Sequence, residues 1–156
     1  MKLVGVIFED FVNYKVPCMT LEFPQCSFKC DKECGKPVCQ NSALAYAKQI
    51  DVNIPDIIFK YLNNPITKAV CCQGLEPFDS WVDLSLFIKE FRELSNDDIV
   101  IYTGYKKDEL SSKIDIIKKW GNIIIKFGRY IPDQISHKDP VLEVMLASDN
   151  QYAERL

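Results

Sequence analysis

The chain has 156 residues, of which 47% are hydrophobic and 26% are charged, so residues 1–156 are expected to fold as one soluble domain with its own core. The 19 Lys and Arg against 22 Asp and Glu give a net charge of −3, which argues against nucleic acid or an anionic membrane as a partner. The N-terminal apolar run is too short for a signal sequence, and no segment reaches the length of a membrane span, so we expect a cytoplasmic protein.

Strand and helix signals alternate along the chain. Short runs of β-branched and aromatic residues predict strands at 3–8, 19–23, 68–73, 99–102, 123–127 and 141–146. Helical spacing of apolar residues, or Ala-rich composition, predicts helices at 42–50, 55–62, 80–94 and 110–120. This alternation favours an α/β fold with a mostly parallel sheet, whose functional sites lie at the carboxyl ends of the strands.

Four cysteines lie close together between the strand at 19–23 and the helix at 42–50: Cys26, Cys30, Cys34 and Cys39. The loop has no CxxC pair, and the single histidine, His137, is far downstream, so a zinc site is disfavoured. Several thiols in one loop point instead to an iron-sulfur cluster. Cys71 and Cys72 fall within an apolar strand and are expected in the core.

The spacing of Cys26 and Cys30, together with the ending Cys39-Gln40-Asn41, resembles the CxxxCxxC loop of the radical S-adenosylmethionine enzymes. The resemblance implies that three cysteines hold a 4Fe-4S cluster, and that its fourth iron binds S-adenosylmethionine. Alignment on the Cys-Gln-Asn ending favours Cys39 as the third ligand and makes residues 32–38 an insertion. Cys34 is the competing third ligand, because its spacing is closer in length to the family pattern.

A second motif follows the strand at 68–73. Gly74-Leu75-Glu76-Pro77 resembles the Gly-Gly-Glu-Pro motif that holds the amino group of S-adenosylmethionine in that superfamily. A carboxylate and strand-end carbonyls are suitable acceptors for an ammonium group. The resemblance therefore assigns Gly74 and Glu76 to the methionine end of the cofactor, and Val38, just before Cys39, to its adenine.

Three further segments are similar to the small activating enzymes of anaerobic ribonucleoside-triphosphate reductase: residues 98–105, which end in Thr103-Gly104-Tyr105, residues 127–131 and residues 146–151. The resemblance implies a radical S-adenosylmethionine-like partial (β/α) barrel. It implies a radical that is generated on a glycine of a partner such as anaerobic ribonucleotide reductase, with electrons from an external donor such as flavodoxin. It also makes Tyr102, Thr103 and Asn150 candidates for cofactor contact, and we assign no catalytic side chain.

The chain departs from the activase pattern at several places, which suggests a divergent member or another substrate. Leu75 replaces a glycine and Phe127 stands where an aspartate is expected. One alternative is a radical S-adenosylmethionine enzyme that acts on a small molecule, similar to the synthase of the deazapurine pathway, with Lys126 and Arg129 as hints of a basic substrate pocket. Another is a non-catalytic zinc or iron-sulfur binding module.

Overall fold

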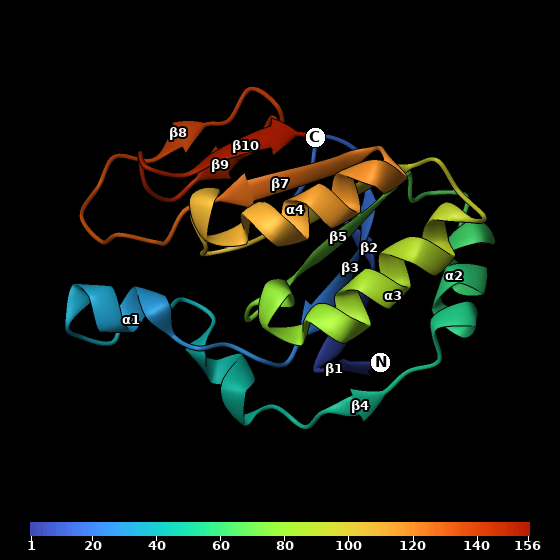
Figure 1. Ribbon diagram of the computed structural model, residues 1–156, viewed down its shortest axis with the longest axis horizontal. Helices are drawn as coiled ribbons and strands as arrows, with labels where there is room; N and C mark the ends of the chain where they lie inside the picture. Colours follow the sequence, from blue (N-terminus) through green and yellow to red (C-terminus); the bar gives the residue numbers. More distant parts are fainter.

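The computed structural model describes residues 1–156 and contains an open, six-stranded sheet with the helices α2, α3 and α4 on one face (Figure 1). The strand order is β10-β7-β6-β5-β3-β2. The four inner strands are parallel, while β2 and β10 pair antiparallel at the two edges. The sheet strands are β2 (Gly5–Asp10), β3 (Cys18–Phe23), β5 (Ala69–Gly74), β6 (Asp98–Tyr102), β7 (Ile123–Phe127) and β10 (Tyr152–Arg155).

The remaining elements are short or lie on the faces of the sheet. The α-helices are α1 (Lys29–Cys34), α2 (Ile54–Leu62), α3 (Trp81–Arg92) and α4 (Ser111–Ile117). The 3-10 helices are η1 (Ser42–Tyr46), η2 (Pro77–Ser80), η3 (Asp108–Leu110) and η4 (Lys118–Trp120). Two small antiparallel pairs join β1 (Lys2–Leu3) with β4 (Ile50–Asp51), and β8 (His137–Lys138) with β9 (Met145–Leu146).

The alternation of side chains along each strand divides the core between the two faces of the sheet. On the helix-covered face, Leu21, Val70, Ile101 and Ile125 pack with the helices in the larger core. The opposite face has a smaller core, in which residues of the inner strands meet the segments before β3 and around β9. Helices therefore cover one face only, and the other face is left partly open at the carboxyl ends of the strands.

The strand at 123–127 is confirmed with the predicted bounds, and the mostly parallel sheet is confirmed as well. The expected partial (β/α) barrel is not confirmed: the sheet is open and not closed into a barrel, and an antiparallel strand ends it on each side. The expected helix at 42–50 was wrong beyond its first turns: η1 stops at Tyr46, buries none of its residues, and Ile50 pairs in β4 instead. Cys71 and Cys72 are fully buried in β5, as expected.

The expected final strand at 141–146 was also wrong in most of its length. Only Met145 and Leu146 are extended, and the last strand of the main sheet is β10. The helix α1 inside the cysteine loop was not predicted. None of the helices combines the length and the apolar character that crossing a membrane requires.

Candidate metal centre

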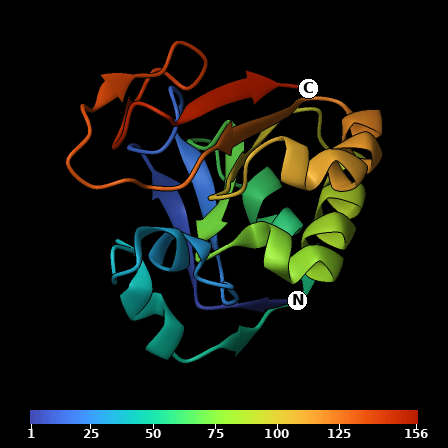
Figure 2. The ribbon, with the colours of Figure 1, turned by 60° about the vertical axis from the view of Figure 1, so that its left-hand side comes forward.

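A pocket of about 350 Å³ opens at the carboxyl ends of the parallel strands. That volume lies in the range of small-molecule and cofactor sites. Its wall includes residues from β3, β5, β6 and β7 and from the loop around α1 and η1. In Figure 2 this loop lies next to the tip of the β5 arrow. The predicted site residues that line it are Cys26, Cys30, Cys39, Gly74, Glu76, Tyr102 and Thr103.

Three of the four loop cysteines face this pocket. Cys26 follows β3, Cys30 lies in α1, and Cys39 lies after the turn that leaves α1; all three are half-buried. Cys34 is the last residue of α1 and does not line the pocket. The geometry thus groups the three thiols of the Cys-Gln-Asn alignment and leaves the inserted thiol outside.

The insertion is closed by Asp31, a residue that sequence reasoning missed. Asp31 Oδ1 accepts hydrogen bonds from the backbone N–H groups of Val38 and Cys39, each at 2.8 Å. Between these residues the chain forms the end of α1 and turns at Gly35, whose φ of +67° is the left-handed conformation that glycine favours. The carboxylate therefore returns Cys39 to the start of α1 and lets residues 32–38 project outward.

The ending of the cysteine motif contacts the Gly-Leu-Glu-Pro segment directly. Asn41 Nδ2 donates to the carbonyl oxygen of Gly74 at 2.8 Å. In addition, the N–H of Glu76 donates to Gln25 O at 2.8 Å, one residue before Cys26. The two motifs, which are far apart in the sequence, form adjacent walls of one pocket.

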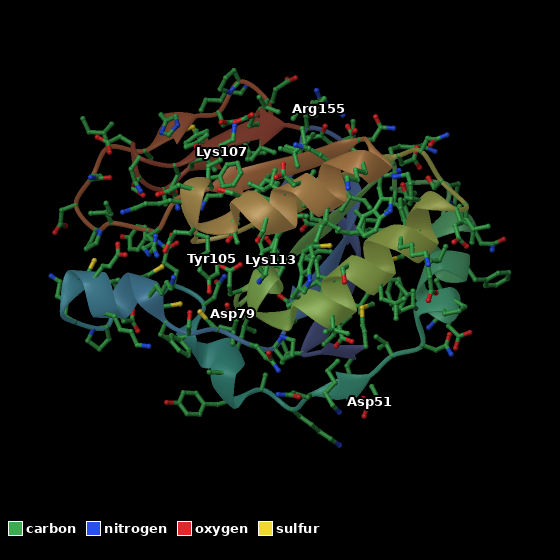
Figure 3. The ribbon with its side chains drawn as sticks, viewed as in Figure 1. Asp51, Asp79, Tyr105, Lys107, Lys113 and Arg155 are labelled. Carbon is green, nitrogen blue, oxygen red and sulfur yellow. The ribbon has the colours of Figure 1, made fainter.

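The loop between Cys26 and α1 is fixed by polar contacts from η2 and from the segment after β6. Asp79 Oδ2 accepts from the backbone N–H of Ser27 at 2.6 Å, and Asp79 Oδ1 accepts from the Tyr105 hydroxyl. Figure 3 labels Asp79 and Tyr105 beside the base of α1. The Asp79–Ser27 contact fixes the chain after Cys26, and the hydrogen bond from the N–H of Glu76 to Gln25 O fixes it before Cys26.

Backbone N–H groups point at the sulfurs of the three grouped cysteines. The N–H of Phe28 donates to Cys26 Sγ at 3.2 Å, and the N–H groups of Tyr130 and Asn41 lower the pKa of Cys30 and Cys39. Burial has the larger, opposite effect: it raises the pKa of all three thiols, that of Cys26 to about 12. Without a metal these thiols stay protonated at neutral pH, whereas metal binding requires their thiolate forms.

Glu76 is buried at the pocket wall, and its carboxylate is held by three donors. Its Oε1 accepts from the Thr103 hydroxyl at 2.8 Å and from the N–H of Phe78 at 3.1 Å; its Oε2 accepts from the N–H of Gly104 at 2.9 Å. Burial raises the pKa of Glu76 to about 7, although the three donors oppose that shift. A carboxylate accepts about four hydrogen bonds, so one site on Oε2 remains for a ligand.

The other predicted cofactor contacts differ in position. Tyr102 lines the pocket and donates its hydroxyl to Asn13 O, which draws the β2–β3 loop to the pocket. Val38 and Asn150 do not line the pocket, and Asn150 Nδ2 donates to Arg129 O at 2.9 Å. The neighbouring Gln151 lines the pocket instead of Asn150.

One family model, described as a 4Fe-4S single cluster domain, matches residues 17–152, which include all four loop cysteines and every inner strand of the sheet. The chain belongs to this 4Fe-4S single cluster domain family. Comparison with curated proteins and with solved structures found no match. The family match therefore supports the prediction that this 4Fe-4S protein binds an iron-sulfur cluster. Such a cluster is compatible with a redox enzyme.

The grouped thiols are a suitable ligand set for a cluster. No three His, Cys, Asp or Glu side chains converge closely enough to hold a single metal ion. Cysteines that hold a 4Fe-4S cluster bind different irons, so they surround a space and do not converge on one point. The half-buried sulfurs of Cys26, Cys30 and Cys39, each approached by a backbone N–H, fit that requirement.

Proposed function

We propose that this protein is a radical enzyme that holds a 4Fe-4S cluster through Cys26, Cys30 and Cys39 and binds S-adenosylmethionine in the adjoining pocket. The observation that carries the proposal is the junction of the two motifs at the hydrogen bond between Asn41 and Gly74. Three thiols line the same pocket as a buried carboxylate and strand-end carbonyls. A three-cysteine set leaves one iron open for a ligand.

The chain's own residues would orient the cofactor and limit the access of water to the pocket. When bound, a reduced cluster would supply the single electron for the reductive cleavage of S-adenosylmethionine. Thr103 and Gly104 hold the Glu76 carboxylate in place, and its free acceptor site would bind the ammonium group of the cofactor. The carbonyl of Gly74 is occupied by Asn41, which fixes the strand end against the cysteine loop.

For the substrate, we propose a glycine of a glycyl-radical partner such as anaerobic ribonucleotide reductase, with an external electron donor such as flavodoxin. The order of the sequence resemblances supports this reading. A second candidate is a radical enzyme that acts on a small molecule. It is favoured by Lys126, whose side chain is buried and lines the pocket, because a protein glycine offers no anion to such a cation.

The first experiment is anaerobic purification followed by iron and sulfide analysis of single Cys→Ala variants at positions 26, 30, 34 and 39. We expect brown protein with about four irons per chain, and only Cys34→Ala should keep a full cluster. Loss of the cluster in Cys34→Ala together with its retention in Cys39→Ala would reverse the ligand assignment. Colourless protein that carries zinc would contradict both enzyme readings.

The second experiment measures cofactor chemistry. The reconstituted protein, reduced with dithionite, should convert S-adenosylmethionine to 5′-deoxyadenosine, and Glu76→Gln should weaken binding of the cofactor. A glycyl-radical signal in electron paramagnetic resonance after addition of anaerobic ribonucleotide reductase would favour the activase reading. Cleavage of the cofactor with no radical on that partner would favour the small-molecule reading.

A further inference from the structure

A row of polar side chains crosses the helix-free face of the sheet just inside the pocket. Its members are aligned by the strand register: Glu22 of β3 is opposite Gln73 of β5, and Tyr102 of β6 is opposite Lys126 of β7. The pairing of Cys72 with Ile101 places Gln73 beside Tyr102. All four side chains line the pocket. An apolar sheet face thus ends in a continuous polar row on four adjacent strands.

Lys126 stands out in this row because it is a buried cation without a counter-ion. Only 7% of the residue is exposed, and its ammonium forms none of the ion pairs of the chain. Its one hydrogen bond is to Gly128 O at 3.0 Å. An ammonium group has three N–H donors, so two remain without a protein acceptor.

The nearby acids do not neutralise Lys126. Glu22 lies at the other end of the row, three strand spacings or roughly 14 Å away. The Cys30 thiol is close enough to raise the pKa of Lys126, but burial raises the pKa of this thiol, so without a metal it forms no counter-ion at neutral pH. Glu76 is committed to Phe78, Thr103 and Gly104, although its charge attracts the ammonium from a distance. Burial lowers the pKa of Lys126 to about 8, as expected for a cation that lacks a partner. A buried charge is costly unless it is paired.

We propose that the polar row is a binding site for a carboxylate, and that Lys126 binds this carboxylate with its two free N–H donors. Tyr102 lies between Lys126 and Gln73 in the row and donates its hydroxyl to Asn13 O. Gln73, two strands away from Lys126, supplies further hydrogen-bonding capacity along the row. The carboxylate has two possible sources, the amino-acid end of S-adenosylmethionine or a separate small substrate. The first source rests on the proposed function, whereas the second requires only the pocket.

Binding is measured by anaerobic calorimetry on the full chain with three probes: S-adenosylmethionine, its decarboxylated analogue and succinate. Lys126→Met removes every donor while keeping the length of the side chain, and Lys126→Gln keeps an uncharged donor. Lys119→Met, at an exposed lysine, is the control for loss of one positive charge. Thermal unfolding and iron content of each variant identify any variant that does not fold.

We expect Lys126→Met to lose affinity for a carboxylate probe by about tenfold or more, the value of a charge-assisted hydrogen bond, with a smaller loss in Lys126→Gln. Lys119→Met should bind as the wild type does. If only S-adenosylmethionine loses affinity, and its decarboxylated analogue does not, the cofactor is the source of the carboxylate. If only succinate loses affinity, the source is a separate substrate.

The succinate titration is repeated on protein without a cluster, which separates this inference from the proposed function. Lys126-dependent binding of succinate would support the carboxylate site even if the wild type binds no S-adenosylmethionine. Wild-type protein that binds no carboxylate probe would overturn the inference. A Lys126→Met variant that binds all probes as the wild type does would also overturn the inference. If the only change in this variant were a shifted reduction potential, Lys126 would be a counter-ion of the cluster and not a carboxylate ligand.

Discussion

Arg129, just after β7, donates from both terminal nitrogens to the two carboxylate oxygens of Glu109, each at 2.8 Å. Glu109 also accepts from Lys29 Nζ at 2.9 Å, and Arg129 Nε lies 3.1 Å from Glu33 Oε1. Because Lys29 and Glu33 lie in α1, the Arg129–Glu109 pair links the cysteine-bearing helix to the main sheet. The helix α1 buries none of its own residues, so this ion pair, and not hydrophobic packing, holds α1 in position.

Glu109→Gln should therefore loosen α1 and lower cluster retention. Arg129 is almost fully buried while Glu109 is about one-quarter exposed, so we expect a stability loss of about 1–3 kcal/mol in urea unfolding. Glu154→Gln removes the acid of the exposed Lys107–Glu154 pair and is the matched control, with no measurable loss expected. Equal behaviour of the two variants would show that the Arg129 pair does not hold the helix.

Asp31 is the second contact whose removal should affect the cluster loop. Asp31→Ala leaves the N–H groups of Val38 and Cys39 without their acceptor, and we expect a loss of about 1–2 kcal/mol, confined to the loop. Iron content after reconstitution should fall, and amide hydrogen exchange at these two residues should rise. Asp31→Asn keeps a side-chain oxygen and should retain most of the cluster. Full iron content in Asp31→Ala would contradict this role.

The inner strands could be predicted from the sequence because burial on both faces makes them nearly continuous apolar runs. Ile123–Phe127 is buried throughout, and its bounds follow from Gly121 on one side and Gly128 on the other. Tyr152–Arg155 could not be predicted, because it is a half-exposed edge strand with no β-branched residue. Backbone pairing with β7 and the ion pair of Arg155 with Asp98 stabilise it.

The Cys-Gln-Asn ending, and not the spacing, indicates Cys39 as the partner of Cys26 and Cys30, whereas the spacing alone favours Cys34. The reason why these three thiols line one pocket could not be read from the sequence. Whether residues 32–38 are an outward loop depends on the long-range contacts of Asp31 and Asn41. Lys126 was only a hint in the sequence, because its burial depends on strand register and on Gly128. The helix at 42–50 failed for a related reason: Ala-rich composition favours a helix, but no buried face stabilises one there.

Gly74 is the position at which a single methyl group should be most disruptive. Its φ is +97°, and a Cβ there would lie 2.7 Å from the backbone nitrogen of Phe23. We expect Gly74→Ala to destabilise the fold by about 2–4 kcal/mol, from left-handed strain together with overpacking. Gly35→Ala is the control. Gly35 also has a positive φ, of +67°, but a Cβ added there has no neighbour within 4 Å, so the variant should lose only about 1 kcal/mol, from backbone strain alone. Urea unfolding compares the two, and equal losses would contradict the packing argument.

Glu76 should make stability depend on pH in a direction opposite to that of an ion-paired acid. Its folded-state pKa is about 7 against an ordinary value of 4.5, so between these values the folded protein binds more protons than the unfolded chain. The stability contributed by this group is present below about pH 4.5 and is lost as the pH rises through about 7. Burial of the ionised carboxylate is the physical cause.

Glu76→Gln removes this titration, so its stability relative to the wild type should improve steadily from about pH 4.5 to about pH 7.5. The measurement is the urea midpoint of cluster-free, reduced protein across that range. In Glu76→Gln the side-chain amide N–H group faces one of the groups that donate to Glu76 in the wild type, and that donor loses its acceptor. The variant should therefore be less stable than the wild type near pH 4.5, the acidic end of the range. Glu93→Gln, at an exposed acid, should give a curve parallel to that of the wild type. A parallel curve for Glu76→Gln as well would mean that Glu76 stays ionised over the whole range.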